Sequence, residues 1–272
     1  MTETASVPAP HRLVLSAGEY QHVVELAAVD MPPGWKPTEG SPSASATSEL
    51  TERGVLQHKD NRFTVHPSVL MNLRILAAPM IIVDTTVSIG NRGSHSLHTV
   101  AGQLGASLFA LDNGAVELSM FAAVSLGQEL IRAVPPEHDA GISAQLGGPV
   151  ELEPLPSSRV PLSALHELGL ATLLASADPD APGVVLSQLD LFADQAHLVR
   201  CLGRSDGVLT SVVSGRALHG VTSTVVIWLH LDAGWLGVLP DPDGSGRQLV
   251  RLEPASRTDL GTWVAPLIAG VL

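Results

Sequence analysis

The 272-residue chain repeats one order of sequence patterns in its two halves. The first copy comprises an apolar run at 107–111, the turn Asp112-Asn113-Gly114, a second apolar run at 116–118 and a helix start near Ser125. The second copy comprises 235–239, the turn 241–244, the run 249–252 and a helix start near Ser256. Asn-Gly and Asp-Gly supply the positive φ angles that hairpin turns need, so each copy is typical of strand, turn, strand and capped helix. A duplicated α/β unit predicts a scaffold with quasi-two-fold symmetry.

The spacing of apolar residues predicts further helices and strands around the two copies. Ser16 and Glu19 have the spacing of a capping box, which predicts a helix from 16 to about 29. β-branched residues at period two predict an antiparallel meander over 80–120, of which 81–89 is the clearest strand. The remaining helices are expected at 49–53, 67–77, 125–134, 161–175, 187–202 and 257–269. The remaining strands are expected at 95–102, 106–112, 115–120, 207–214, 217–219, 223–231, 234–239 and 248–252.

Proline and glycine divide the chain into two parts. They are frequent over 135–158, which is typical of a connector. We therefore predict an N-terminal α/β half at 1–136, a connector at 137–158 and a C-terminal α/β half at 159–272, together forming one compact α/β (α+β) domain. A second stretch rich in proline, serine and glycine, 31–48, predicts a long loop.

The charge balance argues against nucleic acid and membranes as partners. Twenty-seven acidic side chains against fifteen basic ones give a formal charge of −12, which repels phosphate backbones and anionic lipid headgroups. The most apolar stretch, 221–239, is interrupted by His230 and Asp232, so we expect no transmembrane segment. A single cysteine and an N-terminus without a basic and then apolar signal favour the cytoplasm.

The chain is unusually apolar for its charge content. Hydrophobic residues make up 45% of it, charged residues only 15%, and the mean hydropathy is +0.26. This balance indicates an apolar docking patch on the surface. The alternative is that alanine, valine and leucine are simply abundant throughout the chain.

Residues 203–207, Gly-Arg-Ser-Asp-Gly, match the G-x-S-x-G pattern of a hydrolase nucleophile elbow. That elbow needs a strand before the serine and a helix after it, whereas the patterns around Ser205 predict the reverse order. An α/β-hydrolase also needs an acid after the serine and then a histidine. The last histidine of the chain is His230, and the only acidic residue between Ser205 and His230 is Asp206. We therefore expect a turn from helix to strand.

Metal and nucleotide motifs are incomplete. The stretch 241–246 lacks the third ligand before its glycine and the later glutamate of a calcium loop, so it predicts a hairpin turn. His95 and His98 are three apart on a predicted strand and so point to opposite faces. The chain contains neither G-x-G-x-x-G nor G-x-x-x-x-G-K-[ST]. We expect no cofactor and no metal.

The remaining candidates have structural interpretations. Asp190 and Asp194 lie four apart on the predicted helix 187–202, where they form a solvated acidic face rather than a catalytic carboxylate pair. Cys201 is expected at a helix C-terminus, where the negative end of the dipole disfavours a thiolate, which predicts a buried structural cysteine. We expect no catalytic residue and no enzyme.

Three segments carry a resemblance to a known family. They are 49–56 (Glu-Leu-Thr-Glu-Arg-Gly-Val-Leu), 66–79 from His66-Pro67 to Ala78-Pro79, and 252–260 (Leu-Glu-Pro-Ala-Ser-Arg-Thr-Asp-Leu). Their order and spacing, together with the duplication, resemble the EspG family, the cytosolic chaperones of mycobacterial-type (type VII, ESX) secretion systems.

The resemblance implies a quasi-two-fold fold with a central, mostly antiparallel sheet and flanking helical bundles. The implied function is to bind the tip of the PPE protein in a PE–PPE heterodimer, to shield its apolar surface and to keep it competent for export. Segment 31–48 is richer in serine and proline than the helical connection that the resemblance implies.

The predicted interface comprises a glycine-rich loop at 90–94 and the exposed face of helix 187–202. Its candidate residues are Asn91, Arg92, Ser94, Asp190 and Asp194. Two other classes of function stay open. One is a self-associating scaffold, such as a homodimer joined through sheet edges, and the other is a protein that binds a small molecule without catalysis.

Overall fold

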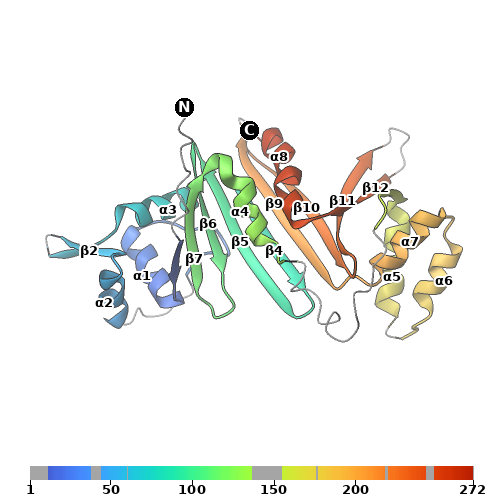
Figure 1. The fold of residues 1–272 in the computed structure, drawn as a ribbon, viewed down its shortest axis with the longest axis horizontal. Coiled ribbons are helices and arrows are strands. Elements are labelled where there is room, and N and C mark those ends of the chain that lie inside the picture. The colour runs from blue at the N-terminus through green and yellow to red at the C-terminus, as the bar shows by residue number, and fades with distance from the viewer. Residues whose placement is uncertain are drawn as a thin grey trace, which may run out of the picture.

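The computed structural model describes residues 12–37, 44–59, 61–136, 155–175, 177–217, 220–242 and 248–271. Over these residues the chain forms one ten-stranded sheet in which all neighbouring strands are antiparallel, in the order β1-β7-β6-β5-β4-β9-β10-β11-β12-β8. Helices lie at both ends of the sheet and over its middle (Figure 1). This confirms the predicted α/β class with a central antiparallel sheet.

The two halves share one order of elements: an edge strand, three helices, a four-stranded meander and a final helix, to which the N-terminal half adds a two-stranded hairpin between its second and third helices. The N-terminal elements are β1 (Arg12–Leu15), α1 (Ala17–Ala27), α2 (Ala44–Glu52), β2 (Leu56–Lys59), β3 (Arg62–Val65), α3 (Pro67–Ala77), β4 (Ile81–Ile89), β5 (Arg92–Ala101), β6 (Leu104–Ala110), β7 (Val116–Ala122), η1 (Ala123–Ser125), α4 (Leu126–Leu130) and η2 (Ile131–Ala133). The C-terminal elements are β8 (Ser158–Pro161), α5 (Leu162–Leu174), α6 (Ala181–Gln188), α7 (Ala193–Leu202), β9 (Gly207–Ala217), β10 (Gly220–Leu231), β11 (Gly234–Pro242), β12 (Gln248–Ala255), η5 (Arg257–Asp259) and α8 (Leu260–Val271).

The halves meet at the centre of the sheet and at one helix pair. β4 pairs with β9 from Ile81↔Gly215 to Ile89↔Gly207. Above this seam α4 packs against α8, and a Cβ on Gly261 would lie only 2.9 Å from the Cα of Gly127. Glycine at this crossing therefore lets the two helix backbones approach closely. The seam and the helix crossing together mark the quasi-two-fold axis that the duplication predicts.

Local sequence explains the clearest elements. In α1 the Ser16 hydroxyl accepts from the backbone amide of Glu19 at 3.3 Å, while the Glu19 carboxylate accepts from the amide of Ser16 at 2.7 Å. This confirms the predicted capping box. Pro67 occupies the first turn of α3, where its missing N–H has no helical partner to lose.

The sheet buries three apolar clusters. Its front face carries one, in which Val83, Leu209 and Trp228 lie beneath α4 and α8. On the back face α1 and α3 cover Leu97 and Leu108, while α5 and α7 cover side chains of β8 and β10 to β12. The middle of the back face has no helix over it among the described residues, because the two helical groups stand at opposite ends (Figure 1).

The structure corrects several expected boundaries. Helix α2 begins at Ala44, inside the predicted loop 31–48, and β9 extends the expected strand 207–214 to Ala217. Residues 218–219 of the expected strand 217–219 lie outside the described residues. The predicted helix 187–202 is wrong, because α6 ends at Gln188 and α7 begins only at Ala193. The short strands β1, β2, β3 and β8 were not expected. Residues 137–154 of the predicted connector and 243–247 of the predicted hairpin turn lie outside the described residues.

Candidate partner-binding surface

The middle of the back face exposes apolar side chains of β9 and β10. Alternate residues of these strands point to opposite faces, and those beneath α4 and α8 are fully buried. On the other side Val208, Val225 and Ile227 keep 37%, 48% and 38% of their surfaces exposed. β-branched side chains on two neighbouring central strands give an apolar strip with a helical group at either end. We call this strip the open sheet face.

The turn between β4 and β5 lies at one end of this seam. The predicted loop 90–94 is wrong in length, because the structure has a two-residue turn, Gly90-Asn91, and Arg92 already begins β5. Gly90 takes a φ of 56°, which glycine adopts without strain. Its amide donates to the carbonyl of Asp206 at 2.7 Å, which fixes the turn against the start of β9. Asn91, Arg92 and Ser94 are all exposed here.

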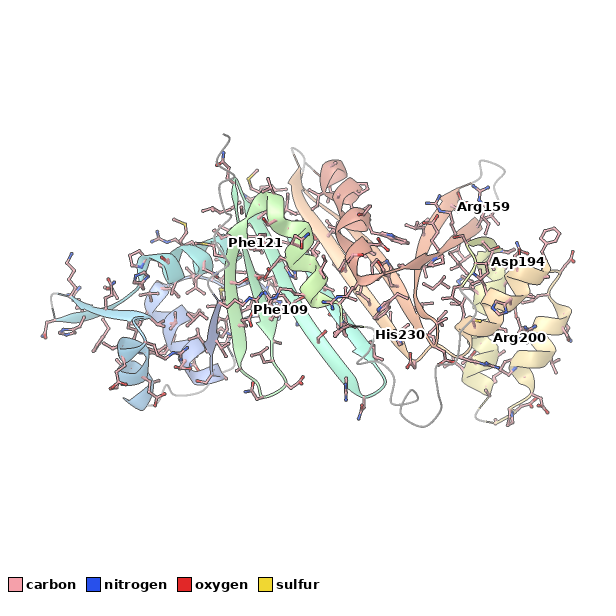
Figure 2. All side chains as sticks on the ribbon, viewed as in Figure 1. Phe109, Phe121, Arg159, Asp194, Arg200 and His230 are labelled. Atoms are coloured by element: carbon pink, nitrogen blue, oxygen red, sulfur yellow. The ribbon has the colours of Figure 1, made fainter. Side chains whose placement is uncertain are left out.

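The two acidic candidates do not share a helix face. Asp190 lies in the break between α6 and α7, and Asp194 lies in the first turn of α7. Both are exposed. A carboxylate in the first turn of a helix stabilises it through the helix dipole, so Asp194 has a structural role as well. Figure 2 shows Asp194 and Arg200 among the helices at one end of the molecule.

The helical group α5 to α7 exposes apolar side chains that the sequence analysis did not place. They are Leu170 (59% exposed), Leu173 (77%), Leu174 (60%), Val184 (51%) and Phe192 (80%). Leu170, Leu173 and Leu174 are three and four residues apart on one side of α5, and we call these three residues the apolar helix patch. The signal for it in the sequence is mixed, since Leu170, Leu173 and Leu174 share the exposed side of 162–174 with the polar residues Ser163, His166 and Glu167. Large aliphatic side chains exposed together are typical of a surface that contacts another molecule.

Two aspartate–histidine pairs lie close to the seam. Asp84 Oδ1 and His95 Nε2 are 2.6 Å apart on the back face, where the His95 ring also stacks on Trp35 with centroids 4.2 Å apart. Asp206 Oδ1 and His230 Nδ1 are likewise 2.6 Å apart. The first pair joins the interiors of β4 and β5, and the second joins the residue before β9 to the end of β10.

A buried polar cluster lies beneath α4 on the front face. The Glu129 carboxylate accepts from the hydroxyls of Ser107 and Ser119, each at 2.7 Å, and pairs with Arg132. Burial by itself raises the pKa of Glu129. The two hydroxyl donors and the Arg132 charge together lower the pKa by more than burial raises it, so the net shift is downward. The group is therefore a carboxylate at neutral pH.

His98 lies in the same interior, on the opposite face from His95 as predicted. Complete burial lowers the pKa of His98 to about 4, which the nearby Glu129 charge only partly offsets. The imidazole is thus neutral at physiological pH. This cluster is closed to solvent and connects α4 to the sheet rather than forming a surface site.

The motif at 203–207 forms a turn from helix to strand. Ser205 follows α7 and precedes β9, so the order is helix, turn and strand, and its hydroxyl donates to the carbonyl of Gly207 at 3.0 Å. A hydrolase elbow is therefore not formed at this serine.

Cys201, expected to be buried, is only half-buried. Among the described residues no group of histidine, cysteine and acidic side chains has a metal-binding arrangement, and no helix has the length and apolar character to cross a bilayer.

Neither a protein-family model nor a curated protein matches this chain. A solved structure does. It is the type VII secretion system chaperone EspG5 of Mycobacterium tuberculosis, in complex with the PE25–PPE41 dimer, which matches with a TM-score of 0.67 over 95% of this chain and 96% of that one. This chain has the EspG fold. The sequences are 13% identical, so the EspG fold is shared through architecture rather than through side chains.

The EspG fold accounts for both halves, because a match over nearly the whole of each chain includes the helical groups as well as the sheet. A second structure, HtdX (Rv0241c) of Mycobacterium tuberculosis, matches with a TM-score of 0.17 and 9% identity, over 89% of this chain and 98% of that one, and shares no fold by this measure.

Proposed function

We propose that this chain is a cytoplasmic specificity chaperone of a type VII (ESX) secretion system. It binds the tip of the PPE protein in a PE–PPE heterodimer and keeps the pair soluble and competent for export. The observation that carries the proposal is the EspG fold over 95% of the chain, because its counterpart was solved with a PE–PPE dimer bound. On this proposal the chain is not an enzyme.

The surface chemistry supports an apolar protein partner. The open sheet face and the apolar helix patch both expose large aliphatic side chains, which soluble proteins display together mainly where they bind another protein. Asn91 in the β4–β5 turn, Arg92 and Ser94 at the start of β5, and the acidic residues Asp190 and Asp194 supply exposed polar groups. An apolar centre with a polar rim is the usual anatomy of a specific interface.

We place the PPE tip on the apolar helix patch, with the open sheet face and the β4–β5 turn beside it. A helical tip that packs its own apolar side chains against Leu170 and Leu174 would remove the apolar surfaces of both proteins from water. This placement would cover the leucines that α5 exposes.

Co-expression tests the function itself. The chain is produced with each PE–PPE pair of the same genome, and the products are separated by size-exclusion chromatography. A stoichiometric complex that keeps its PE–PPE pair soluble supports the chaperone function and names the substrate. Absence of a complex with every pair contradicts it. A concentration-dependent dimer of the free chain would then favour the self-associating scaffold, and a co-purified small molecule would favour a binding protein.

Paired variants test the surface. Leu170→Glu places a charge in the apolar helix patch and should reduce affinity for the PE–PPE pair at least tenfold. A tenfold loss corresponds to about 1.4 kcal/mol of binding free energy. Val124→Glu is the matched control, because Val124 is 95% exposed in η1, far along the chain from the patch. Equal affinities of the two variants, measured by isothermal titration, would contradict the placement.

Charge reversals test the polar rim separately. Arg92→Glu, Asp190→Lys and Asp194→Lys each alter one exposed charge at the proposed rim, and Glu49→Lys alters an exposed charge on α2 as a control. Rim charges mainly change the association rate and its salt dependence, so stopped-flow association at two salt concentrations is the measurement. If the three rim variants associate like the control, these residues lie outside the interface.

A further inference from the structure

A small pocket opens where α7 meets the turn between β10 and β11. It has a volume of about 150 Å³, and its lining includes Cys201, His197, Arg204 and Asp232. One nucleophile, one base, one cation and one anion therefore meet in one concave site. The apolar walls are supplied by Leu155 and Leu231.

Cys201 and His197 stand one helical turn apart on α7, on the same side of the helix. The Cys201 sulfur is 3.6 Å from His197 Nε2, within the range of a hydrogen bond to sulfur. A thiol must lose its proton before it can attack, and the C-terminal end of a helix does not favour the resulting negative charge. A base in direct contact with the thiol removes this obstacle, and His197 is in that position.

The two charged residues of the pocket define what could enter it. Arg204 presents donors that fit a carboxylate, and Asp232 presents acceptors that fit an ammonium group. A ligand that carries both groups on a short aliphatic body matches this pair. The half of a small disulfide that is built from an amino acid has that chemistry.

We propose that Cys201 is a site of reversible thiol–disulfide exchange with small disulfides that carry both a carboxylate and an ammonium group. His197 accepts the thiol proton, and the Cys201 sulfur attacks one sulfur of the incoming disulfide. A new bond forms between Cys201 and that sulfur, the original sulfur–sulfur bond breaks, and the departing thiolate takes up the proton. The incoming disulfide is the oxidant, and excess small thiol reverses the step. This inference is independent of the chaperone function.

The experiment uses the full chain at pH 7 with glutathione disulfide as the charged probe and hydroxyethyl disulfide as the neutral probe. Intact-protein mass spectrometry follows adduct formation over time, and Cys201→Ser gives the blank because the chain has no other cysteine. The wild type should react with glutathione disulfide faster than with hydroxyethyl disulfide. Excess reduced glutathione should remove the adduct.

The variants separate a chemical role from a structural one. His197→Gln should slow both probes by about tenfold, since base assistance is lost, whereas mere loosening of the pocket would expose the sulfur and accelerate both. His166→Gln, an exposed histidine on α5, is the matched control. Arg204→Gln and Asp232→Asn should each reduce the preference for glutathione disulfide by about threefold, at an unchanged rate with the neutral probe.

Two outcomes would overturn the proposal. One is a wild type that reacts with neither probe while denatured chain reacts with both. The other is a His197→Gln variant, folded by circular dichroism, that reacts as fast as the wild type. If His197→Gln fails to fold, the Arg204→Gln variant carries the test, and an unchanged probe preference then contradicts the assigned ligand class.

Discussion

The two halves of this molecule share one architecture but stabilise it with different chemistry. When Gly127 of α4 is matched to Gly261 of α8, Glu129 matches Trp263. In the N-terminal half Glu129 forms a buried hydrogen-bonded cluster with two serines and Arg132. In the C-terminal half Trp263 packs edge-on against Trp228, with ring centroids 5.6 Å apart. One helix position over one sheet is therefore filled by a polar network in one half and by aromatic packing in the other.

The helical groups differ as well. In the N-terminal half Leu73 and Leu76 of α3 are completely buried, whereas in the C-terminal half Leu173 and Leu174 of α5 are 77% and 60% exposed. The N-terminal group also exposes apolar side chains, but less of each, since Leu26, Phe63 and Met71 keep 37%, 42% and 45% of their surfaces exposed. The two halves thus differ in how much apolar surface their helical groups leave uncovered.

The largest expected effect is the loss of the polar cluster. Glu129→Ala leaves two buried hydroxyls and Arg132 without their shared acceptor and should lower the free energy of unfolding by about 3 kcal/mol. Urea denaturation measures it. Glu253→Ala in the C-terminal half is the control, because its pair with Arg251 is largely exposed, and it should cost less than about 1 kcal/mol. Similar losses of unfolding free energy in the two variants would show that the buried cluster stabilises the chain no more than an exposed ion pair does.

The same cluster should make the N-terminal half sensitive to acid. His98 has a pKa of about 4 when folded and 6.5 as a free side chain, so only the unfolded chain binds the proton between these values. Stability should therefore fall as the pH drops from 6.5 to 4, by on the order of 3 kcal/mol. The lowered pKa of Glu129 acts in the same direction, since its stabilisation is lost below about its free value of 4.5.

His98→Gln removes this titration and should flatten the pH profile of urea denaturation above pH 4. His166→Gln, at an exposed histidine of α5, is the matched control for the loss of one imidazole. A His98→Gln profile as steep as that of the wild type would locate the acid sensitivity elsewhere in the chain.

Each half also covers a strand glycine with an aromatic ring, and the two should tolerate a methyl group differently. A Cβ on Gly105 would lie 2.2 Å from the Phe121 ring, and one on Gly237 would lie 2.0 Å from the Trp263 ring. Phe121 is buried, with 8% of its surface exposed, whereas Trp263 is only partly buried. We expect Gly105→Ala to cost about 3 kcal/mol and Gly237→Ala about 1–2 kcal/mol in thermal or urea unfolding. The reverse order would show that Trp263 is the more firmly held ring.

The smallest effect is a gain in the exposed C-terminal helices. Gly169 lies inside α5 with open space around its Cα, so Gly169→Ala should stabilise the chain by about 0.5–1 kcal/mol through helix propensity. Gly114→Ala is the contrasting change, because Gly114 has a φ of 76° in the β6–β7 turn and should lose about 1 kcal/mol. Thermal melts of both variants distinguish these signs. A destabilised Gly169→Ala would mean that α5 packs more closely than its exposure indicates.

An element could be predicted where all the residues that specify it lie close together in the sequence. The Ser16 capping box, the Pro67 helix start and the β-branched strand 81–89 all lie within a few residues and are confirmed. The break between α6 and α7 was missed because the leucine and phenylalanine spacing across 186–192 continues the helical period. The four-residue strands β1 and β8 were missed because they exist only through pairing with β7 and β12.

The candidate site divides in the same way. The sequence predicted an apolar patch on the surface, but which leucines of α5 are exposed follows only from the tertiary structure. Asn91 is exposed on a short turn and Arg92 and Ser94 are exposed at the start of β5, while Asp190 and Asp194 are separated by a helix boundary. Whether these residues touch a partner is a prediction that the variants above test.

By itself the sequence determined that the chain folds as two copies of one α/β unit, because turn glycines, caps and alternation act over short distances along the chain. Only the tertiary structure decided how the copies join. The β4–β9 seam, the Gly127–Gly261 crossing and the cluster around Glu129 each unite residues far apart in sequence. Such contacts depend on which surfaces remain after local structure has formed, and no local pattern encodes that outcome.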